Sequence, residues 1–138
     1  MAGLEGGCFC GAIRYRIEAP VRGVRACYCR KCQYMGAGGP NYVAMAPKAA
    51  FRVTRGEPRR HSAPADSGAD VARLFCGDCG TYLWSDSPAY DVYPVRVGTL
   101  DDPSGMTPQV QIWTEAAQPW HHLDPALPAH PRAAPPAG

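Results

Sequence analysis

Hydrophobic and polar residues alternate in residues 11–19, near the start of the chain. Ile13, Tyr15 and Ile17 occupy alternate positions, and charged residues follow each of them or lie between them. Because successive side chains of a β-strand point to opposite faces, this pattern predicts a strand with one buried face. Turn-forming residues separate further segments of this kind, and we predict strands at 41–46, 51–55, 71–75, 81–84, 91–97 and 109–113.

Helical periodicity is weak along the whole chain. The best candidate for a helix is a single turn at residues 30–35. The 138 residues include 15 glycines and 15 prolines, a composition that disfavours long helices and favours short strands joined by turns. We therefore predict one all-β domain at residues 1–127, followed by a Pro/Ala-rich tail at 128–138 that is mobile or loosely packed.

The N-terminal residues have neither a basic start nor an apolar run, and no stretch of about 18 apolar residues occurs in the chain. We therefore expect no signal peptide and no membrane partner, and a cytoplasmic location. Since the cytoplasm is reducing, closely spaced cysteines there are typical of metal sites or catalytic groups rather than of disulfides.

Seven cysteines fall into three clusters, and none is isolated. Zinc binds four tetrahedral ligands, and a pair of cysteines with two residues between them can bring both sulfurs to one ion. Gly77 and Gly80 permit the turn that the third cluster requires. Two of the clusters supply two sulfurs each, so we predict a closed, structural zinc site formed by Cys8, Cys10, Cys76 and Cys79.

The remaining cysteines, Cys27, Cys29 and Cys32, lie in one short segment. Three thiolates can fill three corners of a tetrahedron and leave the fourth to water or substrate, as in a catalytic zinc site. Arg30 and Lys31 lie inside this segment, where positive charge favours thiolates.

Three alternatives to an open second site stay possible at this point. The cysteines could form disulfides, or they could be a redox-sensing cluster beside a single zinc. A protein ligand such as His61, His121 or His122 could also close the second site and make it structural.

The charge of the chain gives no reason to expect a nucleic-acid partner. The formal net charge of +2 becomes about −1 if seven cysteines bind two zinc ions as thiolates. A short basic stretch either is an exposed face of a sheet or receives the carboxylates of a glutathione-like ligand. It lacks interleaved aromatic residues and consists of Arg52, Arg55, Arg59, Arg60 and His61.

Five motifs between residues 4 and 127 resemble those of a known family. They are Gly-Gly-Cys-Phe-Cys-Gly-Ala-Ile-Arg-Tyr at 6–15, Cys-Tyr-Cys-Arg-Lys-Cys at 27–32, Phe-Cys-Gly-Asp-Cys-Gly-Thr at 75–81, Val-Gly-Thr-Leu-Asp-Asp-Pro at 97–103 and Ile-Trp-Thr at 112–114. In order, spacing and flanking residues they resemble the glutathione-dependent formaldehyde-activating enzyme family, also called the centromere-protein-V-like family.

The resemblance implies an all-β, Mss4-like fold of small antiparallel sheets clasped by a four-cysteine zinc site. It also implies two zinc ions per chain, with the same division of the cysteines into structural and catalytic ligands. The implied activity is that of a carbon–sulfur lyase acting on S-hydroxymethylglutathione, a thiol–formaldehyde adduct.

Two residues depart from the family pattern. Many members have histidine where this chain has Tyr28 and Gln111, so an imidazole is replaced by a group that does not titrate near neutral pH. We predict Tyr28, His121 and His122 as catalytic residues, with His61 a further group that could carry a proton. As substrate-binding residues we predict Arg30, Tyr42, Gln111 and Trp120.

The expected partner is a small thiol conjugate or another metabolite. Two other functions stay open: a zinc enzyme of the same fold that dehydrates, cyclises or hydrolyses a specialised metabolite, and a non-catalytic zinc module that binds a protein. A cavity beside the second zinc would favour an enzyme. Exposed strand edges would allow the chain to form a homodimer.

Overall fold

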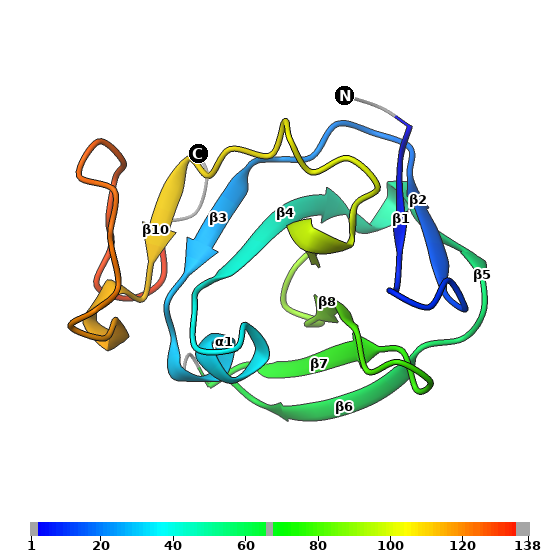
Figure 1. The fold of residues 1–138 in the computed structure, drawn as a ribbon, viewed down its shortest axis with the longest axis horizontal. Helices are drawn as coiled ribbons and strands as arrows, with labels where there is room; N and C mark the ends of the chain where they lie inside the picture. The colour runs from blue at the N-terminus through cyan, green and yellow to red at the C-terminus, as the bar shows by residue number, and fades with distance from the viewer. Residues whose placement is uncertain (1–2, 66–67, 135–138) are drawn as a thin grey trace.

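Ten strands in two sheets form most of the structure, a computed structural model that describes residues 3–65 and 68–134 (Figure 1). The smaller sheet has the order β1–β2–β5, with bounds Leu4–Gly7, Arg14–Ile17 and Phe51–Arg55. The larger has the order β10–β3–β4–β9–β8–β7–β6. Its bounds, in chain order, are β3 Val24–Cys27, β4 Asn41–Pro47, β6 Arg59–Pro64, β7 Asp70–Phe75, β8 Tyr82–Asp86, β9 Val92–Arg96 and β10 Val110–Ile112.

All of these strand pairings are antiparallel except that of β10 with β3, which is parallel. The helical elements are short: α1 spans Arg30–Met35, and 3-10 turns span Lys48–Ala50, Val97–Thr99 and Thr114–Ala116. No helix in the described parts of the chain is both long and apolar enough to cross a membrane. The prediction of an all-β fold is confirmed, and each of the seven predicted strands and the helical turn has a counterpart.

Three strands were not predicted, because each lacks the alternation of a half-buried strand. β6 is almost wholly exposed, so no apolar face marks it. β1 contains Gly6 and Gly7, and glycine is required there: a Cβ on Gly6 would lie 2.4 Å from the Tyr15 hydroxyl oxygen. β3 has only four residues, three of them buried. Strand signals therefore fail where a strand is exposed, tightly packed or very short.

Both sheets contribute to one hydrophobic core. The alternation of β2 places Tyr15 and Ile17 inward, at 1% and 0% exposure. The Tyr15 ring stacks on Phe51 at 5.1 Å between centroids, and Phe51 packs on Trp84 of the larger sheet at 4.6 Å. The Tyr15 hydroxyl is paired with Thr99 Oγ1 at 2.7 Å, so the buried ring keeps a polar partner.

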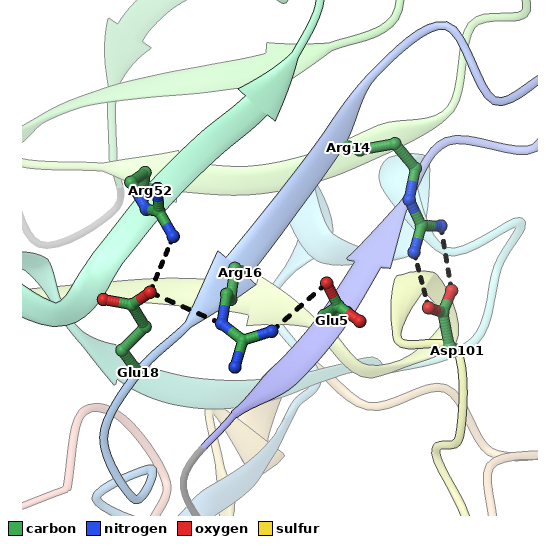
Figure 2. Close-up of polar contacts among 6 residues, drawn as sticks. All are labelled: Glu5, Arg14, Arg16, Glu18, Arg52 and Asp101. Atoms are coloured by element: carbon green, nitrogen blue, oxygen red, sulfur yellow. Dashed lines mark hydrogen bonds and ion pairs between the residues drawn. The ribbon is translucent and has the colours of Figure 1, made fainter.

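Ion pairs cover the opposite side of the small sheet, where the polar residues of β2 point (Figure 2). Arg16 contacts both Glu5 at 3.3 Å and Glu18 at 3.4 Å, and Glu18 also pairs with Arg52 at 2.7 Å. These pairs cross the sheet from β1 to β5.

A fork-shaped ion pair ties β2 to the loop after residue 99. Arg14 donates two hydrogen bonds to the Asp101 carboxylate, at 2.9 and 2.5 Å (Figure 2). The guanidinium holds the pKa of Asp101 below its usual range, so the carboxylate stays ionised at neutral pH.

The C-terminal tail is docked rather than loose in its first residues. Gln111 N donates to Pro128 O at 2.9 Å, His130 N donates to Gln111 O at 2.9 Å, and Trp113 N donates to Arg132 O at 3.0 Å. The expectation of a loose tail is therefore wrong for residues 128–132, because the free edge of β10 offers backbone groups that this segment pairs with. Residues 135–138 lie outside the described residues, and the domain boundary at 127 stays a prediction.

The Arg14–Asp101 pair predicts a small, salt-dependent loss of stability. Asp101→Asn should lower the free energy of unfolding at pH 7 by about 0.5–1 kcal/mol in low salt, and by less in 1 M NaCl, because exposed ion pairs are screened. Urea unfolding measures both values. Glu57→Gln, outside every described ion pair, is the control and should show no such salt dependence.

Candidate metal centres

Four cysteine sulfurs from two distant segments meet in the first cluster. Cys8 and Cys10 follow β1, whereas Cys76 and Cys79 follow β7, and the four Sγ atoms all lie within 4.8 Å of one another. The Cys8–Cys10 and Cys10–Cys76 sulfurs are 3.6 and 3.7 Å apart. Sulfurs bound at 2.3 Å to the corners of a tetrahedron are about 3.8 Å apart, so the arrangement fits zinc.

Backbone amides support the first cluster from both sides. Ile13 N donates to Cys8 Sγ at 3.2 Å, and Asp78 N donates to Cys76 Sγ at 3.4 Å. Thr81 Oγ1 lies 3.1 Å from Cys79 Sγ, and this contact, the largest cause, together with backbone hydrogen bonds from Thr81 and Cys10 lowers the pKa of Cys79 to about 6. Such hydrogen bonds stabilise the thiolate form that zinc ligation requires.

The second cluster lies where β3 passes into α1. Cys27 ends β3, Cys29 caps the N-terminus of α1, and Cys32 lies within the helix. Cys29 Sγ accepts a hydrogen bond from Cys32 N at 3.4 Å, so the same contact begins the helix and brings two sulfurs together. All three sulfurs lie within 4.8 Å of one another.

Hydrogen bonds with the neighbouring thiols of Cys27 and Cys32 lower the pKa of Cys29. The cysteines of both clusters are free, so the structure contains no disulfide among them.

No histidine or carboxylate of the described residues completes the second cluster. His121 is nearby, but its Nε2 is 2.7 Å from Gly38 O, and its Nδ1 accepts a hydrogen bond from Gln118 N at 2.8 Å. Because Nδ1 is an acceptor, we assign the proton to Nε2 and the ring to its neutral form. The described residues thus provide three ligands and leave one corner for another group.

Asn41 was not among the site residues predicted from the sequence. It begins β4, directly opposite Cys27, and is only 5% exposed. Its Nδ2 lies 3.8 Å from Cys32 Sγ, whereas its Oδ1 is the one buried side-chain oxygen or nitrogen, among described residues, without a hydrogen-bond partner. An unsatisfied buried acceptor costs about 1–3 kcal/mol, so this oxygen favours a ligand that carries an O–H or N–H group.

Tyr28 lies beneath the surface beside the second cluster. It is 3% exposed, and its ring meets the His121 ring edge-on at 5.2 Å between centroids. Burial, followed by the nearby Tyr42, raises the pKa of Tyr28, so the phenol keeps its proton at neutral pH. Trp120 is largely exposed and packs on His121 at 4.4 Å.

Other predicted site residues have different positions. Arg30 is exposed and stacks over Tyr34, and His122 is exposed as well. Gln111 is buried, and its amide is used by the backbone of Asp124: Nε2 donates at 2.8 Å and Oε1 accepts at 2.7 Å. The catalytic and substrate-binding roles of these residues stay predictions.

Gln33 connects the second cluster to the C-terminal segment. It is 2% exposed, and its Nε2 donates to Tyr28 O at 2.8 Å and to Ala116 O at 2.9 Å. Its Oε1 accepts from Gln118 Nε2 at 3.1 Å. The only signal in the sequence was a glutamine in a short helix, too weak to show its role.

Comparison with known proteins agrees with this geometry. A family described as glutathione-dependent formaldehyde-activating enzyme matches residues 3–116. The chain belongs to this family. The resemblance found in the motifs is therefore confirmed.

Two similar proteins show how much of the chain the similarity covers. A Halomonas elongata protein named "Putative glutathione-dependent formaldehyde-activating enzyme" is 26% identical over 127 residues, which cover 88% of this chain and 81% of that protein. A crystal structure of a Rhodobacter sphaeroides protein is similar with a TM-score of 0.56 and 25% identity, covering 70% of this chain and 87% of that one.

The two clusters predict different results when one ligand of each is removed. The parent should bind about two zinc ions per chain, and Cys29→Ser should bind about one and keep its fold, because the first cluster stays intact. Cys76→Ser should unfold, because Cys76 is buried in the core and joins both sheets. Metal analysis and circular dichroism measure both effects, and an unfolded Cys29→Ser would mean that the second site is structural.

Proposed function

We propose that this protein is a zinc-dependent carbon–sulfur lyase acting on a small thiol–aldehyde adduct of the S-hydroxymethylglutathione type. The observation that carries the proposal is a cluster of three sulfurs that no fourth described ligand closes. Membership of the formaldehyde-activating family supports the substrate class.

The cysteines would hold the metal in two different ways. Cys8, Cys10, Cys76 and Cys79 would enclose a structural zinc, and Cys27, Cys29 and Cys32 would hold the catalytic one. At the open corner a zinc ion supplies Lewis acidity, which stabilises a thiolate or polarises an oxygen at the reacting carbon.

The reaction moves one proton from oxygen to sulfur. As the carbon–sulfur bond of the adduct breaks, its electron pair leaves with sulfur, and the hydroxyl loses its proton while the carbonyl forms. We assign this transfer to the Tyr28 hydroxyl, which accepts the proton from the substrate hydroxyl and donates its own to sulfur. The phenol then need never ionise, as its raised pKa requires.

Three neighbouring residues orient the reacting groups or hold them in place in this mechanism. Asn41 Oδ1 accepts a hydrogen bond from the substrate and so satisfies an acceptor that the protein leaves without a partner. His121, held through both ring nitrogens, supports the Tyr28 ring instead of carrying the proton. Gln33 fixes the carbonyl of Tyr28 and thus the backbone of the cysteine segment.

A second candidate is a zinc enzyme of the same fold with different chemistry, such as hydrolysis or dehydration of a metabolite. The position of Gln111 favours it, because an amide bonded twice to Asp124 cannot replace a proton-carrying histidine. Turnover of thiol–aldehyde adducts distinguishes the two, and failure on every such adduct would exclude the lyase.

Tyr28→Phe tests the proton transfer. It should lower kcat for formaldehyde release by about a hundredfold, since general acid–base groups contribute at least that much, while the zinc content stays unchanged. Tyr34→Phe, an exposed tyrosine of α1, is the matched control and should keep full activity. Equal activity of both variants would remove Tyr28 from the mechanism.

Asn41→Leu tests the orienting contact separately from the chemistry. The variant should keep both metals, because the three cysteines of the second cluster are unchanged, and should lower kcat/KM about tenfold through the loss of one hydrogen bond to substrate. Metal analysis and steady-state kinetics give the two values. Loss of the second metal with no separate kinetic effect would contradict this role.

A further inference from the structure

A hollow of about 310 Å³ lies on the larger sheet, close to the second cysteine cluster but outside the reacting groups described above. Its size is at the lower limit for small-molecule sites. Strands β6, β7 and β8, the end of α1 and the turn after Cys79 supply its lining, which consists of Met35, His61, Arg73, Phe75, Gly80 and Tyr82.

Strand register builds the floor of this hollow. Ala72 and Leu74 of β7 point into the core, so Arg73 and Phe75 point to the other face of the sheet. Across the strands, His61 is paired with Arg73, and Tyr82 is paired with Phe75. Directly paired residues share a face, so two aromatic rings and two basic groups lie together.

The wall of the hollow comes from the helix that carries Cys32. Met35 is three residues after Cys32, and residues at this spacing lie on one side of a helix, about one turn apart. Arg96 fixes this wall, because it donates to Met35 O at 2.7 Å and lies over the Tyr82 ring at 5.1 Å.

Arg73 and the cysteine cluster also affect the pKa of Tyr82, which lines the hollow. Burial, the largest cause, raises the pKa of Tyr82, a hydrogen bond with Ser85 lowers it, and the charges of Arg73 and Cys32 also act on it. Tyr82 therefore lies in the electrostatic field of both the Arg73 guanidinium and the Cys32 sulfur.

The hollow is mostly apolar, and Arg73 and His61 are the basic residues that line it. None of the residues that line it is acidic. No ion pair of the described residues involves Arg73 or His61, although Arg14, Arg22, Arg52 and Arg60 all have carboxylate partners. Apolar walls strengthen the attraction of such groups for an anion.

We propose that this hollow binds an organic acid with an apolar body, its carboxylate held by Arg73 and His61 and its apolar part resting on Phe75, Tyr82 and Met35. The inference that this acid is the body of the thiol conjugate rests on the proposed function, whereas binding itself does not. The substrate would then carry its sulfur toward Cys32, one helical turn away.

The experiment uses the full zinc-loaded chain and two probes, 4-phenylbutanoate and its uncharged amide, 4-phenylbutanamide. Backbone amide shifts in NMR titrations give the affinity and the place of binding. The carboxylate should shift residues of β7 and β8 and bind about tenfold more tightly than the amide. Arg73→Gln should abolish that preference, and Arg22→Gln, which removes the same charge from a pair with Asp91, should retain it.

Cys29→Ser separates this proposal from the lyase hypothesis. It should lose the second metal and any turnover but bind the carboxylate probe as the parent does. Loss of probe binding in Cys29→Ser would mean that the carboxylate binds the metal, and a preference retained in Arg73→Gln would mean that Arg73 does not hold the carboxylate. Either result overturns the proposal, and absence of turnover in the parent alone would contradict only the lyase.

Discussion

Four sulfurs hold together two parts of this chain that are far apart in sequence. Cys10 and Cys76 are 66 residues apart, yet their sulfurs are 3.7 Å from each other, and they join the end of β1 to the turn after β7. A chain of this size with many glycines and prolines buries a limited core, so a metal ion bound to these sulfurs would contribute a large share of the free energy of folding. The packing of Tyr15 and Phe51 of the small sheet against Trp84 of the large one provides a second junction between the sheets.

The second cluster differs from the first in how it is built. Its three cysteines are neighbours in sequence and come together through one strand end and one helix start. Residues from elsewhere then surround it: Asn41 contributes an amide, and Gln33 ties the cysteine segment to the C-terminal segment. A metal in the first cluster would therefore link segments distant in sequence, whereas a metal in the second would be held by one short segment with three cysteine ligands.

Two of the predicted site residues, Tyr28 and Gln111, provide no group that titrates near neutral pH. Tyr28 is buried with a raised pKa, and Gln111 carries an amide that does not titrate and is hydrogen-bonded twice to the backbone of Asp124. The available hydrogen-bonding groups are the phenol of Tyr28 and the amide of Asn41, which donate and accept without changing charge. Under the proposed function, such a site would suit a reaction in which a proton moves between two atoms of the same substrate rather than one that needs a strong base.

The sequence by itself determined the class of fold and the division of the cysteines. Alternation in β2 and turn residues between segments are local signals, and cysteine spacing is set by the geometry of one metal ion. Only the tertiary structure decided which side chains surround the sulfurs. Asn41 and Gln33 act through contacts with segments distant in sequence, and His121 is withdrawn from ligation by Gly38, 83 residues away. The tertiary structure also decided how the tail and β6 pair, because edge pairing depends on which backbone groups a neighbouring strand leaves free.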